Sequence, residues 1–218
     1  MQSIFSESEK ILEALDIIKS SDMFLVGIGT ELAMGRRDED ELNDFFKDIA
    51  KLLKGKNYFL ITLNTDGFIN DAGLDDDRIV EPCGNVRKLQ CPDGCRDAVY
   101  PESDFAEGAK VCPECGKILI ENTVLAEHYV ENGYLDDWKR YTTWVSTTLN
   151  RNLCVLELGA KMEFPNIIRW PFEKMVSINN KAKMIRINNA LPQLSEETAK
   201  KGVGIKGDPA VIVKKLII

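Results

Sequence analysis

Short apolar runs that stop at a glycine or an asparagine constrain the fold of this chain more than any other feature. Residues 58–63 form such a run without alternating polar positions, as in strands that are buried on both faces of a sheet. Helical patterns lie between the runs. Strands that alternate with helices predict an α/β fold with a doubly wound, Rossmann-like parallel sheet. The other predicted strands are residues 23–26, 153–158 and 183–187.

Capping residues mark where the helices begin. Ser6 and Glu9 form a capping box, Asp38 opens a second helix that we expect to end at Gly55, and Asp208 precedes a short last helix. Residues 136–149 are expected to form one more helix. The apolar residues of the second helix recur at helical spacing and should face the core. They are Leu42, Phe45, Phe46, Ile49, Leu52 and Leu53.

The composition excludes several classes of protein. Hydrophobic residues make up 44% of the 218 residues, enough for a sizeable core. The 28 Lys and Arg against 35 Asp and Glu give a net charge of −7, which disfavours nucleic acid because its binding depends on cationic side chains. No apolar run approaches the length of a membrane span, and no signal peptide is recognisable. We therefore expect a cytoplasmic protein that binds neither nucleic acid nor membranes.

The single histidine, His128, limits the chemistry further. Catalytic zinc, iron and copper sites usually use two or three imidazoles. We therefore interpret His128 as a surface or packed residue.

Four cysteines form the clearest chemical signal. Cys91 and Cys95 are spaced C-x3-C, and Cys112 and Cys115 are spaced C-x2-C, each pair in a turn that contains Pro or Gly. Four thiolates complete a tetrahedron around zinc and leave no position for water or substrate, so the site would be structural. Disulfides are disfavoured in a cytoplasmic chain. We expect a zinc-ribbon module at residues 86–122, inserted into a Rossmann-like domain made of residues 1–85 and 123–218.

The two remaining cysteines differ in their surroundings. Cys154 lies within an apolar run and is expected to belong to the core. Cys83 follows Glu81 and Pro82 at the end of a predicted strand, where ligands bind in folds of this type.

A glycine-containing turn follows the first predicted strand. Gly27 and Gly29, with Thr30 after them, form half of a dinucleotide-binding fingerprint. Glycines at such a turn allow the backbone to approach a pyrophosphate, although they also simply end strands.

Taken in chain order, these features resemble the sirtuin family of NAD-dependent protein deacylases and ADP-ribosyltransferases. Residues 26–30, Val-Gly-Ile-Gly-Thr, are similar to the family's Gly-Ala-Gly-x-Ser loop, and residues 62–67 look like its Thr-Gln-Asn-Ile-Asp-Gly stretch. The two cysteine pairs also occur in sirtuins. The resemblance extends from about residue 21 to the C-terminus. Further similar stretches are residues 72–73, 81–85, 156–160, 187–188 and 207–208.

The resemblance implies a site at the carboxyl ends of the strands that binds NAD and an acylated or ADP-ribose-accepting protein. It assigns Asn64 and Asp66 to nicotinamide departure and places Cys83 at the position of the catalytic histidine. The implied NAD-binding residues are Gly27, Gly29, Thr30, Glu31, Asn64, Asp66, Gly159, Ala160 and Asn188.

Departures from the family pattern predict altered chemistry. Leu63 replaces a glutamine, Ala160 and Lys161 replace a Thr-Ser pair, and residues 31–37 take the place of the usual cofactor loop. Cys83 is a poor replacement for a histidine, because a thiol of ordinary pKa is mostly neutral at pH 7. Deacylation should therefore be impaired more than cleavage of NAD. In this respect the chain resembles macrodomain-linked sirtuins, which also lack the histidine.

Several alternatives stay open at this stage. Glu31, Glu81 or His128 could replace the missing base. The protein could instead be an inactive module that binds NAD or ADP-ribose, or a zinc-ribbon interaction protein without a nucleotide.

Overall fold

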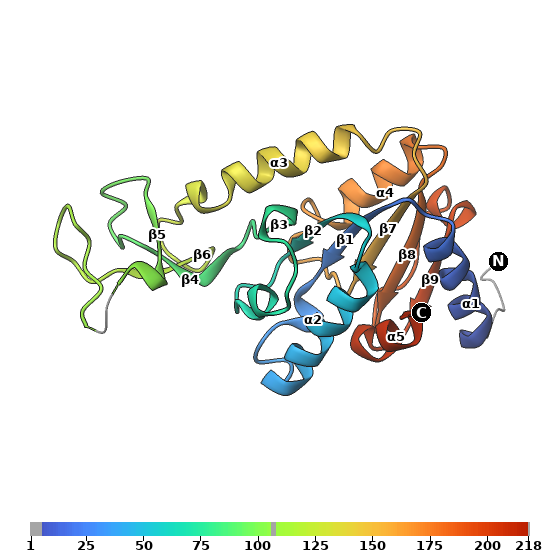
Figure 1. Ribbon diagram of the computed structural model, residues 1–218, viewed down its shortest axis with the longest axis horizontal. Coiled ribbons are helices and arrows are strands. Elements are labelled where there is room, and N and C mark those ends of the chain that lie inside the picture. Colours follow the sequence, from blue (N-terminus) through green and yellow to red (C-terminus); the bar gives the residue numbers. More distant parts are fainter. Residues whose placement is uncertain (1–5, 106–107, 218) are drawn as a thin grey trace.

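A computed structural model describes residues 6–105 and 108–217. Its centre is a six-stranded sheet in the order β3-β2-β1-β7-β8-β9, and every neighbouring pair is parallel (Figure 1). This order reverses direction between β1 and β7, as in Rossmann folds, where ligands bind at that switch point. The strands are β1 (Met23–Ile28), β2 (Asn57–Thr62), β3 (Ile79–Val80), β7 (Leu153–Leu158), β8 (Lys183–Asn188) and β9 (Gly202–Lys206).

Helices cover both faces of this sheet, which confirms the doubly wound prediction. One face packs on α1 (Glu7–Lys19), α2 (Glu39–Leu53) and α5 (Pro209–Leu216). The opposite face packs on α3 (Leu135–Ser146) and α4 (Arg169–Ile178), which lie together above the sheet in Figure 1. Because both faces are covered, the central strands are buried along their whole length, as their unbroken apolar runs predict.

The local capping signals form as predicted. The Ser6 hydroxyl accepts from the backbone N–H of Glu9, and the Glu9 carboxylate accepts in return from Ser6. Asp38 caps α2 through Glu41 N–H at 2.8 Å, and Asp208 caps α5. The predicted apolar face of α2 is buried throughout. These three helices therefore begin where the sequence supplies an acceptor for otherwise unpaired backbone N–H groups.

Two elements were not anticipated. Helix α4 has no side-chain cap and carries Pro171 in its first turn, and β9 contains two glycines in five residues. Both lack the local signals that usually mark a helix start or a strand. The remaining 3-10 turns are η1 (Thr30–Leu32), η2 (Phe68–Asp71), η3 (Asp76–Arg78), η4 (Glu102–Asp104), η5 (Glu131–Gly133) and η6 (Thr198–Lys200).

A second, antiparallel sheet extends away from the first, on the left of Figure 1. Its order is β5-β4-β6, with β4 (Gly84–Gln90) in the centre, β5 (Val99–Pro101) on one side and β6 (Ile120–Thr123) on the other. These strands begin at residue 84 and end at residue 123, close to the predicted limits of 86 and 122. The division of the chain into domains at those limits stays a prediction.

The helices of residues 6–105 and 108–217 include none that is long and apolar enough to cross a membrane.

Candidate functional site

The loops that follow β1, β2, β7 and β8 meet at the carboxyl edge of the parallel sheet. Gly29 ends β1 at this edge, and its backbone N–H donates to Leu158 O at 2.8 Å. A Cβ at position 29 would lie only 2.2 Å from Ala160 Cα, so only glycine allows β1 and the loop after β7 to approach this closely. Gly27 is similarly confined, by Phe172 and Ile168. The two glycines therefore have a packing role, whatever ligand lies beyond them.

Glu31 lies across the switch point rather than in solvent. It is 8% exposed, and its Oε2 accepts from the backbone N–H and the side-chain amide of Asn189, at 3.2 and 3.3 Å. Its Cβ leaves no room for a side chain at Gly159, whose φ of 62° also favours glycine. The Glu31 carboxylate thus ties the loop after β1 to the end of β8.

Asn64, directly beyond β2, has an incompletely satisfied side chain. Its Nδ2 donates to Leu32 O at 2.6 Å, and the residue is only 3% exposed. Its Oδ1 is buried and receives no hydrogen bond from any described residue. A buried acceptor without a donor is costly, so this atom suits a donor that a ligand brings, such as a hydroxyl or a carboxamide.

Asp66 fixes the loop that follows β1. Its Oδ2 accepts from Met34 N–H at 3.0 Å, and its Oδ1 accepts from Phe68 N–H at 3.3 Å. Burial raises the pKa of Asp66, although these N–H groups oppose the rise. The carboxylate therefore helps to hold the loops after β1 and β2 in place. These loops, with those after β7 and β8, border a crevice at the carboxyl edge of the sheet.

Cys83 forms part of a separate pocket of about 380 Å³ beside the crevice. Burial raises the pKa of the Cys83 thiol to about 12, and the negative charge of Glu163 adds to the rise. The thiol is therefore neutral near pH 7 and does not act as a base. Four aromatic residues line the pocket: Tyr129, Tyr134, Trp138 and Phe164.

Two of the expected site residues, Asn188 and Ala160, have polar groups that are already hydrogen-bonded within the protein. Asn188 donates to Ala160 O at 2.8 Å, and its Oδ1 accepts from the N–H groups of Ala190 and Leu191. Ala160 O also accepts from Arg169 at 2.8 Å, so this carbonyl already has two partners. Asn188 and Ala160 therefore shape the edge of the crevice, and their structural contacts explain their residue types.

The two other proposed substitutes for the base lie in less suitable places. Glu81 is 4% exposed, and its carboxylate accepts from Asn85 at 2.6 Å while Lys88 lies 3.6 Å away. Burial raises the pKa of Glu81. His128 is exposed and lies against Gly94 in the cysteine loop, away from the carboxyl edge of the parallel sheet.

The structure also brings together residues that sequence reasoning missed. Glu163, in the loop after β7, accepts from the Thr30 hydroxyl at 2.7 Å and pairs with Arg36 at 3.2 Å. Beneath this loop, Glu157 pairs with Arg169 and Arg186 inside the protein. A charged residue in the middle of an apolar strand was the available signal for Glu157, whereas nothing local distinguishes Glu163.

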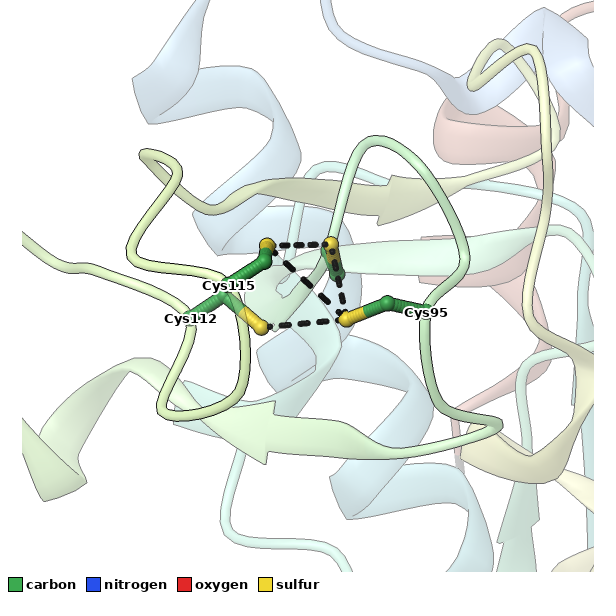
Figure 2. Close-up of side chains that lie close together, drawn as sticks. Cys95, Cys112 and Cys115 are labelled. Carbon is green, nitrogen blue, oxygen red and sulfur yellow. Dashed lines mark hydrogen bonds between the residues drawn. The ribbon is translucent and has the colours of Figure 1, made fainter.

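The four predicted zinc ligands converge at the far end of the second sheet. Figure 2 shows their sulfur atoms facing one another from two loops. The Cys95 sulfur lies 3.4 Å from Cys91 and from Cys112 and 3.9 Å from Cys115, and Cys91 lies 3.6 Å from Cys115. Four sulfurs bound at about 2.3 Å to one tetrahedral ion lie about 3.8 Å apart, which agrees with this cluster.

Backbone amides prepare this cluster for a cation. The N–H of Cys95 is the main cause that lowers the pKa of Cys91 to about 6, and the N–H of Cys115 is the main cause that lowers the pKa of Cys112. These N–H groups favour the thiolate form of Cys91 and Cys112, the form that binds metal, whereas the neighbouring sulfur of Cys112 raises the pKa of Cys95. The site suits a structural zinc ion, because all four ligands come from the protein.

Comparison with known proteins identifies the fold. A six-stranded Rossmann sheet with an inserted four-cysteine tip defines the structural class. No family model matches the chain. A solved structure reported for the mechanism and regulation of Sir2 enzymes aligns with a TM-score of 0.62 and 19% identity, covering 96% of this chain and 97% of that one. A structure of Sir2Tm with a propionylated peptide aligns with a TM-score of 0.63 and 17% identity, covering 95% and 97%. The protein has the sirtuin fold, and the resemblance found in its sequence is confirmed.

Two curated relatives match part of the chain. A probable bifunctional ADP-ribose hydrolase/ADP-ribosyltransferase of Fusarium oxysporum f. sp. cubense is 27% identical over 61% of this chain and 26% of its own length. A protein ADP-ribosyltransferase of Staphylococcus aureus is 21% identical over 76% of this chain and 58% of its own length. The chain thus spans about a quarter of one relative and somewhat more than half of the other.

Proposed function

We propose that this protein binds NAD at the carboxyl edge of the parallel sheet and cleaves its nicotinamide–ribose bond, acting as an ADP-ribosyltransferase in preference to a deacylase. The observation that carries the proposal is the buried Asn64 Oδ1, which receives no hydrogen bond from the described residues and lies beside the Rossmann switch point. The names of both curated relatives agree with ADP-ribosyl transfer. The neutral Cys83 thiol supports impaired deacylation, because collapse towards deacylation needs a base at that position.

The residues of the crevice would have two roles, binding NAD and holding the surrounding loops. Asn64 would hold a donor group of NAD through Oδ1 while its amide stays on Leu32 O. Asp66 and Glu31 would keep the surrounding loops in place through Met34 and Asn189. NAD, once bound, supplies a glycosidic bond with a good leaving group. The four cysteines would hold a structural zinc ion, far from this chemistry.

Titration of the zinc-loaded protein with NAD in a calorimeter tests the proposal. Asn64→Ala should lower NAD affinity about tenfold, the effect of one lost hydrogen bond. Asn152→Ala is the matched control, since this exposed asparagine precedes β7 at the opposite edge of the sheet. An assay of nicotinamide release and of deacylated peptide should then show more nicotinamide than peptide product.

Either of two results would contradict the proposal. The absence of heat at millimolar NAD would favour a zinc-ribbon interaction protein. Saturable binding without nicotinamide release would favour an inactive NAD or ADP-ribose module.

A further inference from the structure

Glu163 occupies a position that links the two halves of the crevice. It belongs to the loop after β7, yet its Oε2 accepts from the hydroxyl of Thr30, the residue that follows Gly29 beyond β1. Its Oε1 lies 3.2 Å from the guanidinium of Arg36. The carboxylate therefore spans the switch point on the side that is open to solvent, where its side chain is 44% exposed.

The same carboxylate lies close to Cys83. Phe164, the next residue in the chain, lines the pocket that Cys83 also lines, so the loop carries Glu163 to the rim of that pocket. The negative charge of Glu163 is near enough to contribute to the raised pKa of Cys83. Glu163 thus lies in the neighbourhood of Cys83, the position at which the family's histidine is missing.

Two contacts leave the carboxylate with free capacity. An ionised carboxylate has about four lone-pair sites, and Thr30 and Arg36 use one on each oxygen. Glu31 and Glu81 differ, because both are more than nine-tenths buried and bonded to asparagine side chains. Among these three carboxylates, Glu163 alone combines access to solvent with a place beside Cys83.

We infer that Glu163 is the general base of this protein. The inference rests on the proposed function, and it names a residue that neither the resemblance nor the comparisons assign. Glu163 accepts the proton of the attacking nucleophile, a water molecule or an acceptor hydroxyl. The oxygen of that nucleophile forms a bond to ribose C1′ while the bond from C1′ to the nicotinamide nitrogen breaks. The electron pair of the broken bond leaves with neutral nicotinamide, and the proton passes from Glu163 to solvent.

Thr30 and Arg36 act as positioning residues in this scheme. Both hold Glu163 at the rim without removing its remaining lone pairs. Arg36 lies within residues 31–37, the segment that departs from the family's cofactor loop. In this scheme the segment supplies Arg36 to orient a carboxylate.

Hydrolysis of NAD by the zinc-loaded protein, with water as the acceptor, provides the test. Glu163→Gln keeps the shape and an acceptor for Thr30, but it cannot take a proton. We expect kcat for nicotinamide release to fall by about 10²–10⁴-fold. Affinity for ADP-ribose in a calorimeter should stay within about twofold, because an exposed ion pair contributes little. Added formate should restore part of the rate to Glu163→Ala, since it returns a carboxylate to the vacated space.

Glu7→Gln is the matched control, because Glu7 is also an exposed carboxylate in an ion pair but lies on α1. A Glu163→Gln variant that keeps more than about a tenth of the wild-type rate would overturn the assignment, given the usual contribution of a general base. A parallel loss of rate and ADP-ribose affinity that formate does not repair would also overturn it. Wild-type protein that binds ADP-ribose without releasing nicotinamide would overturn the proposed function itself, and the calorimetric arm distinguishes that failure from the others.

Discussion

The two ends of this molecule are built in opposite ways. The cysteine cluster draws its ligands from two short loops, and its sulfur atoms lie at the spacing of one ion. The crevice draws its residues from loops after four strands of the parallel sheet, and most of their polar groups are bonded to one another. The cluster has the ligand spacing of a metal site, whereas the polar groups of the crevice mostly bond to one another.

Because of this difference, we expect the two regions to respond differently to substitution and to metal removal. If the cluster holds the proposed zinc ion, we expect the second sheet to unfold when that ion is removed, because only a small apolar core supports it. The crevice rests on a large core on each side of the sheet, so single changes there should alter geometry or chemistry before they unfold the protein.

The largest expected effect is that of zinc removal. Chelation or Cys112→Ser should abolish one equivalent of bound zinc and unfold residues 84–123, since structural zinc contributes on the order of 10 kcal/mol in small domains. Hydrogen exchange should rise in β4 and β6 while the parallel sheet stays protected. Glu114→Ala is the control. Glu114 is an exposed residue between Cys112 and Cys115, and its replacement should leave the zinc content unchanged. Equal loss of protection in β1 and β7 would contradict the independence of the two regions.

The close approach at Gly29 gives the next largest effect. Gly29→Ala should reduce the free energy of unfolding by about 3 kcal/mol, because the new methyl group meets the backbone of Ala160. Gly35→Ala is the matched comparison: its φ is 82°, but nothing lies within 4 Å, so strain alone should cost about 1–2 kcal/mol. Urea unfolding measures both. Equal losses would show that the approach at Gly29 is not tight.

Replacement of Cys83 tests whether the pocket that it lines lacks a base. Cys83→His should raise the yield of deacylated peptide on the order of 10²-fold, because imidazole restores a base where the buried thiol is neutral. Cys83→Ala should leave the yield at its original level. The products can be separated by mass spectrometry. An equal gain from both variants would attribute the effect to space rather than to proton transfer.

The smallest expected effect concerns pH. Burial raises the pKa of Asp66 above its ordinary value of 3.8, so the folded protein holds this proton more tightly than the unfolded chain does. The resulting contribution to stability is fully present below pH 3.8 and is lost as the pH rises through the folded-state pKa. Wild-type protein should therefore gain stability relative to Asp66→Asn on acidification. Urea unfolding of both proteins at several pH values checks the sign, and a relative loss would refute it.

The sequence predicted those parts of the fold that local chemistry specifies. The capping residues Ser6, Asp38 and Asp208 open helices as expected, and the apolar runs form the central parallel strands. Helix α4 and strand β9 were missed, because they are stabilised by packing on the rest of the protein. Ile168 and Phe172 at α4 and Val203 in β9 are buried in the two cores. Their own sequences carry no cap and little strand preference.

The sequence also predicted that the candidate site residues lie at one edge of the sheet, but it did not predict which residues they hydrogen-bond with. The motif positions of Asn64 and Asp66 follow from strand order along the chain, and the contacts Asn64–Leu32 and Asp66–Met34 depend on how the loops meet. Glu163 carries no motif at all, and its meeting with Thr30 joins residues 133 positions apart.

By itself, then, the sequence determined the strand and helix pattern, the four cysteines and the identity of the residues at the strand ends, because those depend on short-range periodicity and spacing. Only the tertiary structure decided which polar groups are satisfied and which are free. It bonded Asn188 and Glu31 to neighbouring loops, left Asn64 Oδ1 without a donor among residues 6–105 and 108–217, and brought the charge of Glu163 near Cys83. The physical reason is that hydrogen-bond partners across a parallel sheet come from distant segments, whose approach is set by packing rather than by local sequence.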